Sequence, residues 1–215
     1  MAVTYSNLQR SLLQETAALH VQNMPIDMAS QIGVGFVRDI FHAGSLSYSG
    51  GITHVAKVDG QVAGFCFAHI DFHQFGKFQR TAHRWLFYRR LLAGLLRKPQ
   101  LFMQLFSAQS YLSLKPEFVN LGPLLVAPQF RTVQSGTNER TSLATELTRR
   151  TFEDIARRAP AMPVRTMIRS SNMGSIAAVA QGARLAGFVL TNKFAIDFDT
   201  DRRIVFEYRS NDGHE

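Results

Sequence analysis

The sequence predicts an α/β fold in which a mixed, mostly antiparallel sheet of six or seven strands carries helices on both faces. Short apolar runs bounded by turn residues recur along the chain, as strands do. Two of these runs are joined by Asp59-Gly60, which favours a two-residue hairpin. Amphipathic segments of helical period alternate with the other runs. The 215 residues, 46% of them hydrophobic and 19% charged, suit a single domain, residues 1–215, with a substantial core.

The N-terminal third predicts two helices and three strands. Residues 3–5 are expected to form an edge strand, and residues 8–19 a helix with leucines on one side. From Asp27 onward, apolar residues at every fourth position predict a second helix, which Gly33 and Gly35 weaken. Residues 53–58 and 61–70 supply the strands on either side of Asp59-Gly60.

Residues 72–115 form a segment longer than a simple connection between strands. We expect it to be mainly helical from about residue 80 to 106, with Pro99 ending or kinking the helix. A basic, aromatic-rich helix can lie on a membrane surface or dock an acyl carrier protein. It can equally cover the sheet and keep its arginines in water. One helical arc holds Trp85, Tyr88, Leu92, Leu95 and Leu96, and the other side holds Arg90, Arg97 and Lys98.

Residues 118–188 predict a strand, a polar loop, a helix, a second strand and a second helix. The first strand stops at Ala127-Pro128, because proline cannot continue a ladder. The first helix is expected to begin at Thr141 or Ser142, with charge pairs Glu146–Arg150, Glu153–Arg157 and Asp154–Arg158 on a solvated face. A strand follows over residues 164–169, and a terminal hairpin pairs residues 194–198 with 203–208.

The composition of the chain limits which binding partners and which cellular compartment are expected. The net charge of +8 favours an acidic or phosphate-bearing partner. No helix-turn-helix, zinc-finger or aromatic RNA-binding signature accompanies this charge, which argues against nucleic acid. The single cysteine, Cys66, fits a reducing, cytoplasmic setting and a buried structural role. The N-terminus has no signal-peptide pattern, so we expect a soluble protein.

The loop after the first strand of this region is suited to an anion. It contains Arg131, Gly136 and Arg140 and leads onto a helix N-terminus. Backbone amides and the helix dipole both favour phosphate at such a place. The sequence therefore predicts a phosphate-binding loop between residues 131 and 141.

With these features placed, the chain resembles the GNAT N-acetyltransferase superfamily over most of its length. The resemblance rests on Leu124-Leu125-Val126-x-Pro128, on Arg131, on the helix from Ser142, and on Asn172 and Gly187-Phe188 around the last helix. It implies an acyl-CoA-binding core at residues 118–188 and a helical insert at about residues 72–115. The expected function is transfer of an acetyl or other acyl group from a CoA thioester to a small-molecule amine, such as an amino sugar. The donor-binding residues it implies are Leu124, Leu125, Val126, Arg131, Gly136, Thr137, Arg140, Thr141 and Asn172.

The catalytic groups are less defined. His69, Asp71 and Glu117 are candidates for the base by position alone. The tyrosine that in this superfamily protonates the leaving thiolate would fall at Ala183. Because His69, Asp71 and His73 alternate, an extended chain would turn them to one face, but the nearby sequence lacks further ligands for a metal, and none is expected. A GNAT-fold protein that binds CoA or another ligand without efficient catalysis, and a basic nucleic-acid or membrane-surface module, remain alternatives.

Overall fold

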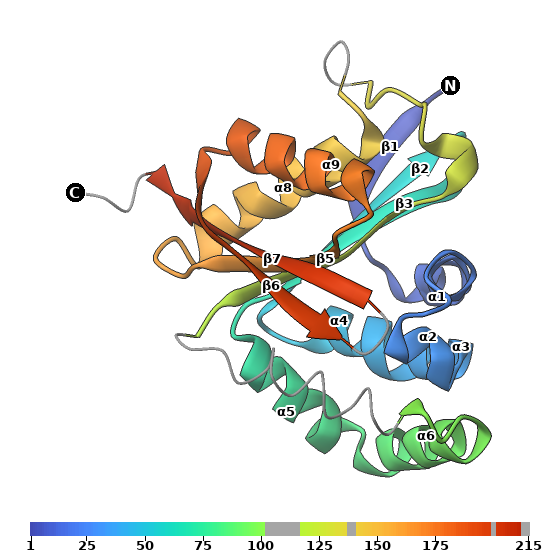
Figure 1. The fold of residues 1–215 in the computed structure, drawn as a ribbon. Helices are drawn as coiled ribbons and strands as arrows, with labels where there is room; N and C mark the ends of the chain where they lie inside the picture. Colours follow the sequence, from blue (N-terminus) through green and yellow to red (C-terminus); the bar gives the residue numbers. More distant parts are fainter. Residues whose placement is uncertain (102–116, 137–140, 199–200, 212–215) are drawn as a thin grey trace.

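The computed structural model describes residues 1–101, 117–136, 141–198 and 201–211. These residues form one seven-stranded sheet of order β1-β2-β3-β4-β5-β7-β6, in which β4 and β5 are parallel and all other neighbours antiparallel. The expected mixed, mostly antiparallel sheet is confirmed (Figure 1). The strands are β1 Val3–Asn7, β2 Gly51–Val58, β3 Gln61–His69, β4 Val119–Val126, β5 Val164–Arg169, β6 Phe188–Phe198 and β7 Asp201–Ser210.

Helices cover both faces of this sheet. In Figure 1, α8 and α9 lie on one side, and the N-terminal helices α1 to α4 lie on the other. A short 3-10 helix, η1, precedes α1, and a π-helix, η2, separates α3 from α4. The bounds are η1 Arg10–Leu12, α1 Leu13–Asn23, α2 Met28–Ile32, α3 Val34–Phe36, η2 Val37–His42, α4 Ala43–Ser47, α5 Phe72–Ala82, α6 Arg84–Arg97, η3 Pro128–Phe130, α8 Leu143–Arg158 and α9 Met173–Leu185.

Both predicted hairpins are present. Asp59 and Gly60 have φ values of 47° and 85°, the pair of positive angles that a tight turn between two strands requires. The terminal hairpin is longer than its sequence pattern predicted, because β6 begins at Phe188 and β7 continues to Ser210. The helix predicted from Asp27 is interrupted where Gly33 adopts a φ of 127°.

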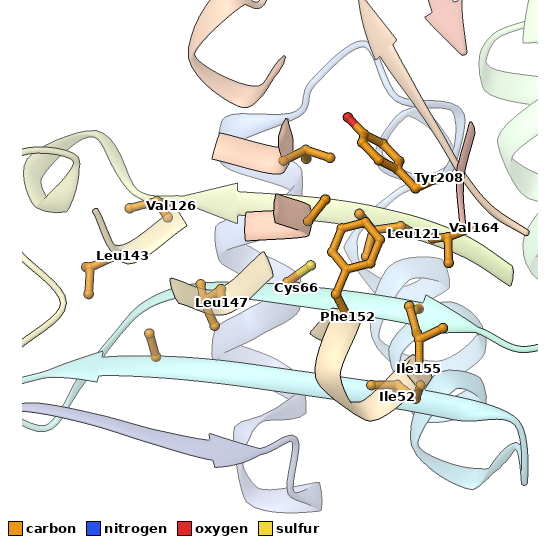
Figure 2. Close-up of a cluster of buried hydrophobic side chains, with 14 of the residues drawn as sticks. Ile52, Cys66, Leu121, Val126, Leu143, Leu147, Phe152, Ile155, Val164 and Tyr208 are labelled. Atoms are coloured by element: carbon orange, nitrogen blue, oxygen red, sulfur yellow. The ribbon is translucent and has the colours of Figure 1, made fainter. Parts of the chain in front are cut away.

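The core is divided between the two faces of the sheet. Phe65 and Phe67 of β3 pack with Leu12 and other residues on the side of α1, whereas Cys66 and Ala68 pack beneath α8. Figure 2 shows side chains of α8 over the strands that carry Ile52, Cys66 and Leu121. Burial raises the pKa of the Cys66 thiol to about 12, which fits a structural role.

Helix α8 begins where the sequence predicted, but its charged side chains form ion pairs that differ in part from the predicted ones. Ser142 caps it by accepting a hydrogen bond from the Thr145 amide at 3.2 Å. Glu146 pairs with Arg150, as expected, and also with Arg149, both at 2.7 Å. The Glu146 side chain is only 2% exposed, so the prediction of a solvated charge face was wrong at this residue.

The remaining charges of α8 also depart from the predicted spacing. Glu153 pairs with Arg149 and Asp154 with Arg157, whereas Arg158 donates to the carbonyl oxygens of Ser49 and Gly51. The carbonyl groups of Ser49 and Gly51 take Arg158, and the i, i+3 neighbour Arg157 takes Asp154, so neither is left for the predicted i, i+4 pair. The predicted pairs Glu153–Arg157 and Asp154–Arg158 were therefore wrong.

The insert is helical over its described part, but its buried face was mispredicted. Helix α6 packs on α2 and α3 rather than on the sheet, and Gly94 lets it approach Ile32 closely. Leu86, Phe87, Leu91 and Leu95 face that contact. Trp85, Tyr88, Leu92 and Leu96, which the periodicity grouped with Leu95, are exposed. Residues 102–106, the end of the predicted helical segment, lie outside the described residues. Over the described ranges, no helix is both long and apolar enough to cross a membrane.

Candidate active site

The sheet forks between β4 and β5. These strands pair only at Val119 with Val164 and at Asn120 with Arg165. Beyond this point β4 carries an extra residue relative to β3, around Gly122 and Pro123, and diverges from β5. The separation begins at Leu121. A bulge in this position explains the divergence, because it bends its strand and ends regular pairing.

A cavity of about 290 Å³ lies at this fork. Its walls come from the loop between α1 and α2, from the diverging parts of β4 and β5, from the first turns of α9, and from β7. Segments that are far apart in sequence therefore meet at one place. The lining residues are Asn23, Met24, Pro25, Ile26, Asp27, Leu121, Gly122, Pro123, Leu124, Thr166, Met167, Ile168, Arg169, Asn172, Ser175, Val179 and Arg203.

The end of β4 presents backbone groups to the gap. The amide of Ala127 donates to Ala63 of β3 at 2.8 Å. Because successive residues of a strand point their N–H and C=O groups in opposite directions, Leu124 and Val126 direct theirs away from β3. The side chain of Leu124 lines the cavity, whereas that of Leu125 packs on the α1 side. Of the three expected donor-binding residues in β4, Leu124 and Val126 are thus placed at the gap by their backbones.

Arg131 lies directly beyond this strand end. It follows η3, and its Nε lies 3.4 Å from the Val126 carbonyl oxygen, to which it donates. The residue is exposed. Its guanidinium is therefore held at the open edge of β4 while remaining accessible to an anion.

The loop that follows Arg131 is closed at its base. The Ser135 amide donates to the Thr141 carbonyl oxygen at 2.7 Å, and Gln134 bridges to Ser142. Gly136 has a φ of 72°, which suits glycine at the start of the loop tip. Thr137 and Arg140, two of the expected donor-binding residues, lie outside the described residues. The loop leads directly onto the capped N-terminus of α8, as the sequence predicted.

Asn172 is the N-cap of α9 and also lines the cavity. Its Oδ1 accepts a hydrogen bond from the Ser175 amide at 3.1 Å. Ser175 and Val179 continue the cavity-facing side of the helix. Ala183, the expected tyrosine position, is fully buried and does not line the cavity. Among the described residues of α9, Ser175 is the hydroxyl-bearing residue that lines this cavity.

The three catalytic candidates from the sequence do not line the cavity. His69 is fully buried, stacks on Phe75 at 3.7 Å and has its Nε2 2.8 Å from the Ser45 hydroxyl. Burial lowers the pKa of His69 to about 3. Asp71 has a φ of 50° and caps α5 by accepting from the Gln74 amide. Glu117 is exposed and precedes β4. Because β3 ends at His69 and α5 begins at Phe72, the expected common face of His69, Asp71 and His73 was wrong.

Sequence reasoning missed Asp27, the carboxylate of the cavity wall. Its Oδ2 lies 3.4 Å from His20 Nε2 and accepts a hydrogen bond from the Ala29 amide at 3.2 Å. Burial raises the pKa of Asp27, but His20, the Ser30 amide and the charge of Arg203 outweigh this and hold the pKa below its usual value. An Asp before a helical pattern signals an N-cap. Nothing in the local sequence indicates that Arg203 of β7 lines the same cavity.

Comparisons with known proteins agree with this architecture. No protein-family model matches the chain, and no curated protein matches its sequence. Among solved structures, a GNAT-family acetyltransferase from Streptococcus pneumoniae is similar with a TM-score of 0.55 and 11% identity, over 97% of this chain and 100% of that one.

Two further structures were solved with ligands. The protein yncA from Salmonella typhimurium, with its cofactor acetyl-CoA, is similar at a TM-score of 0.54 and 16% identity, over 100% of this chain and 96% of that one. Aminoglycoside acetyltransferase AAC(6')-Ib, with coenzyme A and kanamycin, is similar at 0.51 and 10% identity, over 99% and 96% of the two chains. With its forked seven-stranded sheet, this chain has the fold of the GNAT-family acetyltransferases.

Proposed function

We propose that this chain is an N-acyltransferase, with residues 1–215 acting as one domain, that moves an acetyl or other acyl group from a CoA thioester to a small amine. The observation that carries the proposal is the cavity at the β4–β5 fork. It combines an open strand edge, a basic loop leading to a helix N-terminus, and a separate wall with a carboxylate. An acyl donor and an amine can approach this cavity from different sides.

The open edge and the loop fit the donor. Backbone groups of Leu124 and Val126 offer hydrogen bonds to the amide groups of the pantetheine arm. Arg131, the base of the loop at Gly136 and Thr141, and the N-terminus of α8 provide positive charge and amides for the pyrophosphate. Leu125 supports the strand from its opposite face, and Thr137 and Arg140 remain candidates for the same phosphate groups. Asn172 caps α9 and faces the arm from the other wall of the gap.

The chemistry requires three further functions. The tetrahedral intermediate carries an oxyanion, which a strand amide on the gap side of β4 can stabilise. The amine must lose a proton before it attacks the thioester carbonyl, and the CoA thiolate must gain one as it leaves. In place of a tyrosine, the Ser175 hydroxyl or water protonates the thiolate. His69, Asp71 and Glu117 take no part in this mechanism, because the structure does not bring them to the cavity.

The α1–α2 loop fits an amine acceptor. Asp27 and Asn23 place a carboxylate and an amide in the cavity wall, and both favour a protonated amine. AAC(6')-Ib was solved with the amino sugar kanamycin. We therefore propose a small amine, such as an amino sugar, as the acceptor of this chain.

A catalytically weak ligand-binding protein is the second candidate function. One observation favours it, the replacement of tyrosine by small or aliphatic residues on the cavity side of α9. It shares the donor site of the first candidate and differs only in turnover. Binding and turnover must therefore be measured separately.

Calorimetric titration of the purified protein with acetyl-CoA and with longer acyl-CoA thioesters tests the donor site. Thiol release in the presence of kanamycin and other amines then tests the transfer. Cys66 is buried, so released CoA is detected without a background from the protein. We expect saturable binding and amine-dependent release. Binding without release with any amine would support the second candidate, and absence of binding at millimolar ligand would overturn both.

A further inference from the structure

A row of four side chains, which we call the file, runs from the core to the cavity wall. Its members, in order, are Thr16, His42, His20 and Asp27. Thr16 Oγ1 lies 3.0 Å from His42 Nδ1, and His42 Nε2 lies 3.0 Å from His20 Nδ1. His20 Nε2 is in turn 3.4 Å from Asp27 Oδ2. Thr16, His20 and His42 are each at most 1% exposed, whereas the Asp27 side chain is 35% exposed and lines the cavity.

The direction of the hydrogen bonds in this file is fixed at its buried end. Thr16 Oγ1 lies 2.9 Å from the Leu12 carbonyl oxygen, and a carbonyl can only accept, so this contact uses the single hydroxyl proton. His42 Nδ1 must therefore donate to Thr16, which leaves Nε2 of the neutral ring as an acceptor. That acceptor takes the Nδ1 proton of His20. The one nitrogen of the file left to exchange a proton is His20 Nε2, which faces Asp27.

The surroundings favour a neutral ring at His42. Phe41 and Phe65 flank His20, and Phe65 and Phe67 flank His42. Burial, followed by the charges of His20 and His69, lowers the pKa of His42 well below its usual value. The groups that face the cavity end of the file are the Ala29 and Ser30 amides of α2 and Arg203 of β7, and Arg169 of β5 lines the same cavity.

We propose that Asp27 is the group that receives the acceptor's proton, and that His20, oriented by His42 and Thr16, is the positioning residue that takes this proton from Asp27. The inference rests on the proposed acyl transfer and specifies its proton acceptor. A protonated amine is attracted to the Asp27 carboxylate, whose lone pairs the Ala29 and Ser30 amides do not all use. His20 Nε2 makes no hydrogen bond to the described residues, because it can accept one from Asp27 only when the carboxyl group holds the substrate's proton, which fits the 3.4 Å between them.

The proposed step balances as a proton transfer followed by acyl exchange. The ammonium gives one proton to the Asp27–His20 pair, which becomes a carboxylate beside an imidazolium. The amine lone pair then attacks the thioester carbonyl, and the C–N bond forms with a second proton still on the nitrogen. The C–S bond breaks with its electron pair on sulfur, and this second proton passes to the thiolate through the Ser175 hydroxyl or a water molecule, either of which gives one proton and takes one. The imidazolium releases its proton to solvent.

A second His–Asp pair provides a matched control. His54 Nε2 of β2 lies 2.9 Å from Asp154 Oδ2 of α8, and both side chains are mostly buried. Neither residue lines the cavity. Asp27→Asn keeps the cap of α2, because asparagine is as good an N-cap as aspartate, and removes only the charge. Asp154→Asn and His54→Gln remove the same chemistry at a place without substrate.

The test measures kcat/KM for the amine against pH, and acetyl-CoA affinity, in wild type and variants. Positioned acid–base groups contribute roughly 100-fold to 10,000-fold, so we expect Asp27→Asn to lose about 100-fold or more, with unchanged CoA affinity. The activity of this variant should rise steadily with pH, because more of the substrate amine is then already deprotonated in solution and no longer needs a base on the protein. His20→Gln should lose activity mainly in kcat and shift the acidic limb of the profile. The two control variants should stay within about two-fold. A wild-type profile and rate in Asp27→Asn would overturn the proposal while leaving acyl transfer intact.

A second measurement does not depend on turnover. Nitrogen-15 NMR of histidine-labelled protein distinguishes a protonated ring nitrogen from a bare one. We expect Nδ1 to be protonated in His20 and His42, and the chemical shift of His20 Nε2 to respond to Asp27→Asn but not to Asp154→Asn. A bare Nδ1 in His20, or a His20 Nε2 shift unaffected by Asp27→Asn, would overturn the proton file even if the protein proved inactive. Failure of acyl-CoA binding would instead overturn the proposed function.

Discussion

Arg131 is the residue on which the proposed phosphate site depends most directly. It is exposed, and its contact with the Val126 carbonyl holds it at the open end of β4. A charge-assisted hydrogen bond is worth roughly 1.5 to 3 kcal/mol, so Arg131→Ala should weaken acetyl-CoA binding about ten-fold or more. Calorimetry measures this loss.

The control for Arg131→Ala must remove the same charge elsewhere. Arg10 is exposed and does not line the cavity, so Arg10→Ala should change acetyl-CoA affinity less than about two-fold. Arg149 is unsuitable, because its loss would leave buried Glu146 with one partner fewer. Equal losses in the two variants would indicate a general effect of net charge and would contradict a phosphate site at Arg131.

Glu146 is the residue whose charge matters most for stability at low pH. Burial raises its pKa, but hydrogen bonds from Arg149 and Arg150 outweigh burial and hold the pKa below its ordinary value of 4.5. A lowered pKa in the folded state means stability that is fully present above about pH 4.5 and is lost as pH falls through the folded value. Unfolding by denaturant should show wild type losing stability below that pH and Glu146→Gln losing much less.

At pH 7 the same substitution should lower the free energy of unfolding by about 2 kcal/mol, the scale of a charged hydrogen bond. Glu153 shares Arg149 but is 36% exposed, so Glu153→Gln should cost less than about 0.5 kcal/mol. Comparable losses in both variants would show that burial does not distinguish the two pairs.

At the scale of elements, the contact between α8 and α9 depends on Gly182. A Cβ at this position would lie 2.7 Å from Thr148 Cβ and 3.0 Å from the Arg149 backbone nitrogen. Alanine favours a helix over glycine by about 1 kcal/mol, but overpacking against a fixed backbone costs roughly 1–3 kcal/mol. We expect Gly182→Ala to lower stability by about 1 kcal/mol in denaturant unfolding.

Gly174 in the same helix is the matched position. A Cβ there meets only Asn172 Oδ1, at 4.0 Å. Gly174→Ala should therefore raise stability by up to about 1 kcal/mol. If both substitutions stabilise the protein equally, the close contact of α8 with α9 is not as tight as the structure has it.

Turns, strand ends and helix caps that are set by residues close in sequence were predictable. Helix faces and ion pairs that depend on the elements packed beside them were not. The Asp59-Gly60 hairpin, the stop at Pro128 and the caps at Ser142 and Asn172 follow from residues within a few positions. The buried face of α6 does not, because it is chosen by α2 and α3, and periodicity alone grouped Leu92 with Leu95. The ion pairs of α8 likewise depend on loops and strands that pack beside it.

At the scale of the whole molecule, order along the chain predicted the sheet and the donor side of the cavity. Strand, loop and helix follow one another in sequence there, so Leu124, Val126, Arg131 and Asn172 could be placed in advance. The acceptor side could not be predicted. The α1–α2 loop and β7 reach the fork only through the order of strands in the sheet, so Asp27 had no local signal for a catalytic role.

We propose that an acyl-CoA lies in the gap between β4 and β5, and hydrogen–deuterium exchange with and without saturating acetyl-CoA tests this placement. We expect slower exchange over residues 121–136 and 172–175, where amides face the donor, and unchanged exchange in α6. Protection confined to the exposed Trp85–Leu96 side of α6, or no protection at any donor concentration, would contradict it.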